Sequence, residues 1–505
     1  MNFAELTGSV SGVLWALPLV LLALLVGLYY SVRMRFPQVR LFKDMIHFLT
    51  TGGTSDEGIS SFQGFAMALG GRIGVGNIAG VGTAIAFGGP GAVFWMWMIA
   101  FIGASTAYAE SALAQVFKSK IGGEYRGGPA FYIEKGMKHK GFGKAFAIVF
   151  AISAIIANGF TGPTIQAFNV AESMNNAWGL NTTVVGVVLA GLFALVVFGG
   201  MKRIGNVAGK IVPVMAGLYI LLALIILAIN FQRIPEMFGL IFGCAFNLNA
   251  LYGAIWGQAI LWGVKRGIYS NEAGMGSGAH ASAAAEVSHP AKQGLAQSFS
   301  VYVDTLLVCT ATAIMILSTG AYNVYLGDGF ITENAIVSGV EAGTGYTQAA
   351  IDSWIPGLGS SFIAVAIFFF AFTTLLSFAF YTDANINYIA GKSKNRKVYL
   401  TIMRVLLTGI ILLGAVTKSA AAWNLADIGV GLMSWVNFIA LILLSGIAIK
   451  TLKDYERQKA LGLDPVFEPK DIGIDNAELW DDITQSKYQD LLDAKHEAEA
   501  KEKAN

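Results

Sequence analysis

The chain has 505 residues, of which 55% are hydrophobic and only 13% are charged, with 60 glycines. Soluble domains average roughly 25% charged residues. No globular core hides so much apolar surface, so the composition predicts a protein dissolved in a lipid bilayer. Two cysteines, Cys244 and Cys309, are too few for a disulfide framework or a metal-ligand set. A secreted protein, a nucleic-acid binder and a soluble enzyme are therefore disfavoured.

Eleven apolar stretches are long enough to cross a bilayer, which takes about 20 residues. They lie near residues 13–32, 62–88, 92–117, 145–175, 182–200, 208–230, 250–286, 294–320, 356–390, 398–416 and 427–450. Several are long and interrupted by glycine. The sequence therefore predicts an all-α integral membrane protein with eleven transmembrane helices.

The distribution of charge predicts the orientation in the membrane. Of the 26 Lys and Arg residues before residue 451, 21 lie in or beside the loops that follow odd-numbered stretches, 2 lie on the other side and 3 lie within spans. Because basic loops stay in the cytoplasm, the N-terminus is expected outside and the C-terminus inside. Residues 451–505 contain 14 acids and 8 bases, which predicts an acidic, solvated cytoplasmic tail.

Two glycine-rich clusters interrupt apolar stretches near the middle of the bilayer. They read GGRIGVGN at residues 70–77 and SNEAGMGSG at residues 270–278. Close packing of helices through small residues is one explanation. However, Arg72 and Glu272 lie within the clusters, with Lys265 and Arg266 one turn before the second. Charges at this depth are costly and usually mark a pathway or a binding site, so we expect two helices that break inside the membrane.

The positions of the two breaks predict an inverted repeat. If the first stretch is set aside, the breaks fall in the first and the sixth of the remaining ten, which start on opposite sides of the membrane. Corresponding broken helices in two inverted halves are typical of secondary transporters, whose site lies near the midplane. The expected segments are an extra N-terminal helix (1–32), a first five-helix repeat (60–230), a second, inverted repeat (250–450) and the acidic tail (451–505).

Three stretches carry a resemblance to a known family. They are GRIGVGNIAGVGTAIAFGGPGAVFWMW (71–97), YRGGPAFYIEKGM (125–137) and WGVKRGIYSNEAGMGSGAHASAAAEVSHPAKQG (262–294). The sequence here resembles the alanine/glycine:cation symporter family. The resemblance implies a LeuT-like fold with one added N-terminal helix. It also implies a symporter, not an enzyme, that imports a small neutral amino acid across the cell membrane by alternating access, with Na⁺ as coupling ion and no organic cofactor.

The same resemblance implies a set of substrate contacts. Backbone N–H groups of Val75 and Gly76 would bind the substrate carboxylate, with Asn77 beside them. Gln166 would contribute a side-chain contact, although a role in holding helices together is the alternative. Tyr269 and Phe378 would wall the pocket or serve only as packing residues. Family members usually have Phe at the first position and Trp at the second, and the smaller ring of Phe378 leaves more room.

The resemblance also implies a sodium site and leaves three buried charges to explain. The carbonyls of Gly70 and Ile73 and the hydroxyls of Thr373 and Thr374 would bind the ion, although either hydroxyl could instead bond to its own helix. The buried charges are candidates for a gate or a brace, in which Arg72 would pair with Glu272 or Asp427.

Other functions remain open from the sequence. A proton carried by Glu272 or Asp304 could replace sodium, and a larger amino acid such as glutamine could be the substrate. A channel would need a polar lining along several helices, whereas the polar residues here cluster at the midplane. A membrane enzyme would need a nucleophile–base pair or a metal cluster, and we find neither in the sequence.

Overall fold

The computed structural model describes residues 3–50, 57–327, 329–391, 393–477 and 479–504 as an almost entirely helical molecule. The helices are α1 (Phe3–Leu14), α2 (Leu17–Arg33), α3 (Pro37–Arg40), α4 (Phe42–Thr50), α5 (Ser61–Arg72), η1 (Val75–Asn77), α6 (Ala79–Gly88), α7 (Gly91–Val116), α8 (Pro129–Gly136), α9 (Lys140–Ile156), η2 (Ala157–Thr161), α10 (Gly162–Trp178), α11 (Thr182–Val197), α12 (Gly200–Ile229), η3 (Phe231–Arg233), α13 (Ile234–Ala245), η4 (Ala250–Ile255), α14 (Trp256–Asn271), α15 (Gly278–Ala284), α16 (Pro290–Val301), η5 (Tyr302–Cys309), α17 (Thr310–Thr319), η6 (Ala335–Val337), α18 (Thr344–Asp352), α19 (Leu358–Ala390), α20 (Arg396–Ala415), α21 (Ser419–Leu443), α22 (Ser445–Ala460), η7 (Pro469–Ile472), α23 (Leu479–Lys487) and α24 (Gln489–Ala504). Two short antiparallel hairpins complete the described fold: β1 (Ser119–Ile121) with β2 (Glu124–Arg126), and β3 (Val324–Leu326) with β4 (Gly329–Thr332).

Among the described residues, seven continuous helical segments are long and apolar enough to cross a membrane. They are Gly91–Val116, Lys140–Trp178, Gly200–Ile229, Pro290–Thr319, Leu358–Ala390, Arg396–Ala415 and Ser419–Leu443. Two bent pairs pass the same criteria together, Phe3–Leu14 with Leu17–Arg33 and Phe231–Ala245 with Ala250–Asn271. The prediction of an all-α, multi-pass membrane protein is therefore confirmed.

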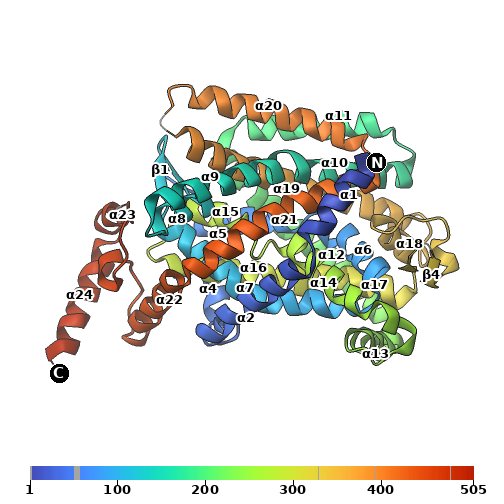
Figure 1. Ribbon diagram of the computed structural model, residues 1–505, viewed down its shortest axis with the longest axis horizontal. Coiled ribbons are helices and arrows are strands. Elements are labelled where there is room, and N and C mark those ends of the chain that lie inside the picture. Colours follow the sequence, from blue (N-terminus) through green and yellow to red (C-terminus); the bar gives the residue numbers. More distant parts are fainter. Residues whose placement is uncertain (1–2, 51–56, 328, 392, 478, 505) are drawn as a thin grey trace.

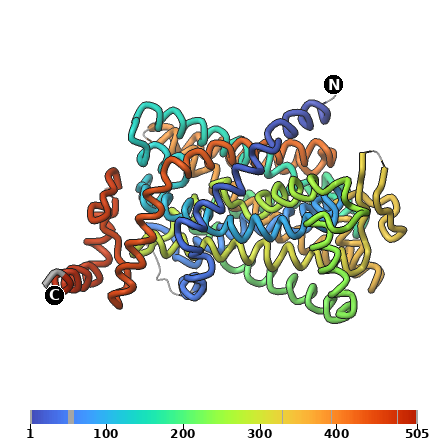
Figure 2. The backbone as a smooth tube through the Cα atoms, turned by 60° about the horizontal axis from the view of Figure 1, so that its bottom comes forward, coloured from blue at the N-terminus to red at the C-terminus, as the bar shows by residue number. Residues whose placement is uncertain are grey.

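The elongated molecule has two distinct ends (Figure 1). At one end, which we call the tail end, α5 and α15 pack against each other near α22–α24. At the opposite end, α6 packs against α14, and α18 and the β3–β4 hairpin lie nearby. Figure 2 shows the red C-terminal segment and the gold hairpin at opposite ends of the molecule. Each predicted break therefore joins a helix at the tail end to a helix at the opposite end.

The start of α5 has a clear local cause. Ser60 accepts a hydrogen bond from the backbone N–H of Gln63, whose side chain accepts one from the N–H of Ser60. This capping box satisfies two N–H groups that a helix start leaves free. It fixes where the polar loop ends and the first broken helix begins.

The tail differs from the solvated extension expected from its charge. Phe467 and Trp480 are fully buried, and their ring centroids lie 5.1 Å apart. Val466, Ile474 and Ile483 are buried as well. The expectation of a solvated tail was wrong for this part of the chain, because a few apolar side chains in a charged sequence are enough to bind it to the body of the protein.

Candidate functional site

The first break separates α5 from α6 through an extended residue and one 3₁₀ turn. Gly74 has φ −138° and ψ −152°, and its N–H donates to Asn77 Oδ1 at 2.8 Å. A Cβ at this position would lie 2.5 Å from Thr374 Oγ1. The glycine is therefore required by a close approach of the neighbouring helix. The N–H of Val75 donates to Gln166 Oε1 at 3.2 Å, which joins the break to α10.

The second break separates α14 from α15 through left-handed backbone. Glu272 has φ +57°, Gly274 has φ +93° and Gly276 has φ +85°. A Cβ on Gly274 would lie 2.1 Å from the Phe438 ring. Left-handed conformations are accessible to glycine without strain, so the glycine cluster in the sequence encodes this departure from the helix.

A buried carboxylate on η5 connects the two breaks. Asp304 accepts hydrogen bonds from Asn77 Nδ2 at 2.6 Å, from Ser270 Oγ at 2.9 Å and from Thr305 Oγ1 at 2.7 Å. Asn77 belongs to the first break and Ser270 to the last turn before the second. Because buried polar groups are costly unless satisfied, this network fixes the two breaks relative to each other.

An internal cavity of about 20 Å³ lies between the breaks. It is lined by Gly71, Arg72, Gly74, Gly76, Ala157, Asn158, Thr161, Gly162, Gln166, Tyr269, Glu272, Met275, Phe378, Ala426 and Val430. Four residues of the predicted substrate set are thus brought together: Gly76, Gln166, Tyr269 and Phe378. Val75 and Asn77 are also buried at the break, but they do not line the cavity.

The four residues of the predicted sodium set lie together where α19 passes the end of α5. Thr374 Oγ1 is 2.9 Å from the carbonyl oxygen of Gly70 and 3.3 Å from that of Ile73. Thr374 Oγ1 also lies 3.0 Å from the carbonyl oxygen of Phe370 in its own helix. Thr373 Oγ1 donates to the carbonyl oxygens of Phe369 and Phe370, and its Cβ would lie 3.4 Å from a Cβ on Gly70. Freed carbonyls at the end of a broken helix are the groups that coordinate Na⁺ in this class of architecture.

Among the described residues, Arg72 forms an ion pair with neither of its expected partners, Glu272 and Asp427. Arg72 donates to the carbonyl oxygen of Asn271 at 2.6 Å, to Gln297 Oε1 at 2.9 Å and to Ser300 Oγ. Its predicted pairing with Asp427 is wrong, because Arg72 ends α5 on the tail side of the break and Asp427 lies on the other side.

Asp427 belongs to a separate cluster on the side of the opposite end. It binds Lys265 at 2.6 Å and Arg266 at 2.8 Å, and the guanidinium of Arg266 lies 4.2 Å from the ring centroid of Trp423. The cluster thus contains two cations and one carboxylate beside aromatic rings. Its planar guanidinium can stack on an aromatic face, which an ammonium cannot do.

Sequence reasoning missed the contribution of η2. This π-helical turn interrupts the fourth apolar stretch and places Asn158 and Thr161 on the cavity. Asn158 Nδ2 donates to the carbonyl oxygen of Ala154, while its buried Oδ1 accepts no hydrogen bond from the described residues. The available signal was the polar, glycine-containing run from Asn158 to Gly162 in an apolar span, since π-bulges often occur at functional sites.

A second, larger cavity opens at the opposite end. It has a volume of about 460 Å³ and is lined by residues of α10 and α18, by the 339–343 segment and by Trp423. The ring of Trp423 contacts that of Tyr269 at a centroid distance of 5.6 Å, and Tyr269 lines the central cavity. Two aromatic rings therefore lie between this vestibule and the central cavity.

These features define a class of protein. A chain with several membrane-spanning helices, two of its helices broken around a small internal cavity, is built as a membrane transporter. The chain belongs to the sodium:alanine symporter family, whose model matches residues 1–469. Residues 470–505 lie beyond the matched range.

Individual relatives are similar along nearly their whole length. The carrier protein YrbD of Bacillus subtilis (strain 168) is 52% identical, over 95% of this chain and 98% of its own. The sodium/proton-dependent alanine carrier protein of Bacillus sp. (strain PS3) is 45% identical, over 86% of this chain and 97% of its own. The sodium/alanine symporter AgcS of Methanococcus maripaludis is 37% identical, over 90% of this chain and 98% of its own. All three are named as transporters, and none as an enzyme.

Proposed function

We propose that this protein is a sodium-coupled symporter that imports a small neutral amino acid of the alanine or glycine type across the cell membrane. The observation that carries the proposal is the meeting of two broken helices at a cavity beside an oxygen-rich site. In this proposal Thr374 Oγ1 and the carbonyls of Gly70 and Ile73 form that site. The residue after Ile73, Gly74, lines the cavity together with Gln166 and Tyr269. The names of the relatives support alanine as substrate and Na⁺ as coupling ion.

Each side of the cavity has a proposed role. The backbone N–H groups of Val75 and Gly76 would bind the substrate carboxylate once Gln166 Oε1 releases the N–H of Val75. Gln166, Asn158 and Tyr269 supply polar groups for a zwitterion, and Phe378 closes the wall for the side chain. A Cβ on Gly162 would lie 2.5 Å from Cε2 of Phe378, so the aromatic ring fills the space that this glycine leaves. A small cavity with this wall favours alanine over glutamine.

Na⁺ binding and substrate binding are coupled through the first break. The proposed ion site uses the carbonyls of Gly70 and Ile73, while the substrate site uses the N–H groups two and three residues after Ile73. An ion that orders the break raises the affinity for substrate, and substrate must raise the affinity for the ion by the same factor. Thr374 is the side chain of the proposed ion site that contacts the backbone of the first break, at the carbonyls of Gly70 and Ile73.

The proposed architecture has eleven membrane spans. The seven continuous helical segments and the two bent pairs account for nine of them. The pair α5–α6 and helix α11 are shorter apolar segments that would complete the count. In this proposal residues 1–32 form an added helix, 60–230 and 250–450 form inverted five-helix repeats as in LeuT-like transporters, and 451–505 form the tail.

The proposed orientation places the N-terminus outside and the tail end in the cytoplasm. The basic residues of the loops support it through the positive-inside rule. The vestibule near Trp423 would then face the outside, and α5, α15 and the tail would face the cell interior.

Uptake of radiolabelled alanine by proteoliposomes under imposed gradients tests the proposal. An inward sodium gradient should drive alanine uptake, and serine and glycine should compete better than glutamine. Uptake that ignores sodium and follows an imposed pH gradient would contradict sodium coupling. In that case the buried carboxylates of Asp304 and Glu272 would become the candidates for carrying a proton.

Selectivity provides a second readout. Gly162→Ala should push the ring of Phe378 into the cavity and reduce alanine uptake, while glycine uptake falls less. Gly191→Ala is a matched control, because a Cβ at Gly191 meets no atom within 4 Å. An equal loss for both substrates would contradict the proposed wall.

A further inference from the structure

The tail is folded onto the body of the protein, and three of its contacts bear on the ends of the broken helices. We use the name strap for residues 464–477 and 479–487, which run from the end of α22 to the end of α23. The strap buries Phe467 and Trp480 completely. These three anchors are a lysine, the indole of Trp480 and a pair of hydrogen bonds with Ser288.

The first anchor is Lys487, which lies between two carboxylates. Its Nζ is 2.5 Å from Glu286 Oε2 and 3.7 Å from Glu57 Oε2. Glu57 precedes α5, the first half of one broken helix, and Glu286 follows α15, the second half of the other. One side chain of the tail therefore links the two broken helices where each of them reaches the tail end of the molecule.

The second anchor is the indole of Trp480. Its Nε1 donates to the carbonyl oxygen of Gln115 at 2.9 Å. The side chain of Gln115 in turn donates to the carbonyl oxygens of Ser282 and Ala285 at 2.5 and 2.8 Å. Trp480 thus contacts the residue of α7 that holds α15 in place. The ammonium of Lys118 lies 4.8 Å from the centroid of the Trp480 ring, which adds a cation–π contact.

The third anchor is a pair of hydrogen bonds with Ser288, in the segment between α15 and α16. The N–H of Phe467 donates to the carbonyl oxygen of Ser288 at 3.0 Å, and Ser288 Oγ donates to the carbonyl oxygen of Pro465 at 2.7 Å. The next residue, His289, contacts Asp454 of α22 at 3.2 Å.

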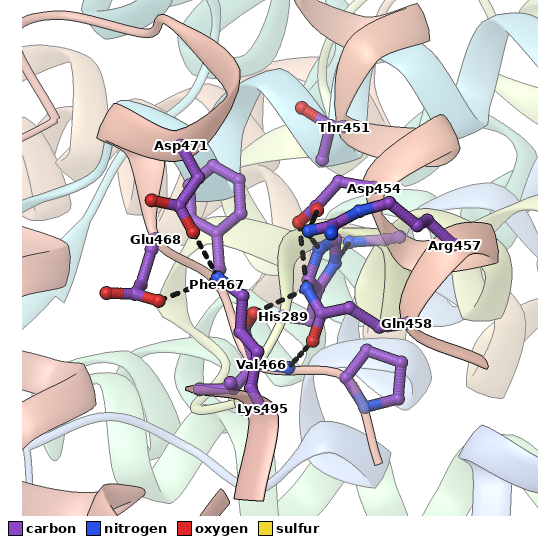
Figure 3. A network of polar contacts seen from close by, with 12 residues as sticks. His289, Thr451, Asp454, Arg457, Gln458, Val466, Phe467, Glu468, Asp471 and Lys495 are labelled. Carbon is purple, nitrogen blue, oxygen red and sulfur yellow. Dashed lines mark hydrogen bonds and ion pairs between the residues drawn. The ribbon is translucent and has the colours of Figure 1, made fainter. Parts of the chain in front are cut away.

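Figure 3 shows how these contacts continue within the tail. Gln458 donates to Asp454 and to the carbonyl oxygen of Val466, and it accepts from the N–H of Val466. Lys495 binds Glu468 and Asp471. The strap is therefore held in a defined conformation by α22 and α24.

The elements that the strap joins are those that close the tail end. Ile59 exchanges backbone hydrogen bonds with Ala284 and Glu286. A Cβ on Gly64 of α5 would lie 2.9 Å from the Cβ of Ala285. A path from the central cavity to this end requires α5 and α15 to separate, because they are packed directly on each other.

We propose that the strap holds the two broken helices together at the tail end, so that its release accompanies opening of the central cavity to the cytoplasm. The proposal rests on the alternating access of the proposed function. Lys487 and Trp480 are positioning residues that act through Glu57, Glu286 and Gln115. Both lie beyond residue 469, where the family match ends.

Thiol labelling at the start of α5 tests the strap. Ser61 is buried, with its Oγ accepting from Gln293 Nε2 at 2.7 Å, so Ser61→Cys is a near-isosteric reporter that α5 exposes only by moving. The initial rate of reaction with a maleimide is measured on the purified full-length protein in detergent. The parent chain gives the blank, since Cys244 and Cys309 are both buried.

Two strap variants should speed the labelling. We expect Trp480→Ala to raise the rate at least about ten-fold, because it removes a fully buried aromatic ring. Lys487→Glu should raise it about three-fold by turning a partly exposed attraction into a repulsion. The double variant Lys487→Glu/Glu286→Lys should recover most of the parent rate.

The matched control is Lys470→Glu. Lys470 belongs to the strap, but the ion pair that it forms among the described residues is with Asp481 of the same segment, so its replacement should leave the rate unchanged. Unchanged labelling in both strap variants, no recovery in the double variant, or an equal rise in the control would overturn the proposal. The assay contains no substrate, so failure of sodium-driven uptake would contradict the proposed function without altering these labelling rates.

Discussion

The two ends of the molecule close the central cavity in different ways. At the opposite end, the rings of Tyr269 and Trp423 lie between the cavity and the vestibule, beside one carboxylate that pairs two cations. At the tail end, closure involves the Arg72 network, the packing of α5 on α15 and the strap. Closure of the opposite end therefore depends on a few side chains, whereas closure of the tail end is distributed over many contacts.

This difference predicts that single substitutions have unequal effects at the two ends. A substitution at the opposite end should remove a large share of the interactions that keep that end closed. A change at the tail end should remove one contact among many. The following predictions test this difference, beginning with the largest expected effect.

Asp427→Asn should have the largest effect. It leaves Lys265 and Arg266 buried with no carboxylate, and breaking a buried ion pair in this way costs about 3–5 kcal/mol. We expect alanine uptake to fall at least about a hundred-fold and the melting temperature to fall as well.

Asp383→Asn is the control for Asp427→Asn. It breaks a buried pair with Arg404, away from the residues that line the cavity. It should lower the melting temperature and leave the KM for alanine near that of the parent. Parent-like uptake in Asp427→Asn would contradict the importance of this cluster.

Trp423→Ala should have the next largest effect. It removes one of the two rings between vestibule and cavity together with the contact to Arg266. A large aromatic group lost from a packed site costs about 3–5 kcal/mol when fully buried, and Trp423 is 8% exposed. We expect alanine affinity, measured by titration calorimetry, to fall by about ten-fold or more. Trp354→Ala, at a more exposed Trp, should leave the affinity unchanged.

Gln293→Ala at the tail end should have a smaller effect. Gln293 donates to the carbonyl oxygen and to Oγ of Ser61, but α5 keeps its contacts with α15 and the strap. Loss of a typical hydrogen bond costs about 0.5–1.5 kcal/mol, so labelling of Ser61→Cys should rise only a few-fold. A rise as large as that from Trp480→Ala would show that closure at this end is not distributed.

The smallest expected effect is the pH dependence of the stabilisation by Glu57, which contacts Lys487 of the strap. A hydrogen bond from Lys120, together with Tyr125 and Lys487, lowers the pKa of Glu57 to about 2. Because the folded pKa is below the unfolded value of about 4.3, the stabilisation is complete above that pH and is lost as pH falls toward 2. The difference in melting temperature between the parent and Glu57→Gln should therefore be constant from pH 8 to pH 5. A difference that shrinks between pH 8 and pH 5 would contradict this assignment.

Features encoded by local sequence could be predicted. Apolar length predicts membrane helices. The glycines, together with Arg72 and Glu272, predict both breaks, because left-handed or closely approached backbone favours glycine. The gathering of Gln166, Tyr269 and Phe378 at one cavity was expected from the family resemblance rather than from spacing.

Features that arise from tertiary contacts could not be predicted. Asp427 of α21 pairs with Arg266 of α14 across 161 residues of sequence, which no local pattern reports. The strap was missed because Phe467 and Trp480 stand 13 residues apart in a charged segment with no helical periodicity. Asn158 reaches the cavity through a π-turn, whose extra residue shifts the helical register.

The dependence of alanine affinity on sodium concentration tests the central claim most directly. The dissociation constant for alanine is measured by calorimetry over a range of Na⁺ concentrations, with choline keeping the ionic strength constant, for the parent and for Thr374→Ala. The account predicts that Na⁺ tightens alanine binding to the parent, that alanine tightens Na⁺ binding by the same factor, and that Thr374→Ala loses most of this coupling while keeping its order of preference among amino acids. Alanine binding that is independent of Na⁺ in the parent, or unchanged coupling in Thr374→Ala, would contradict it.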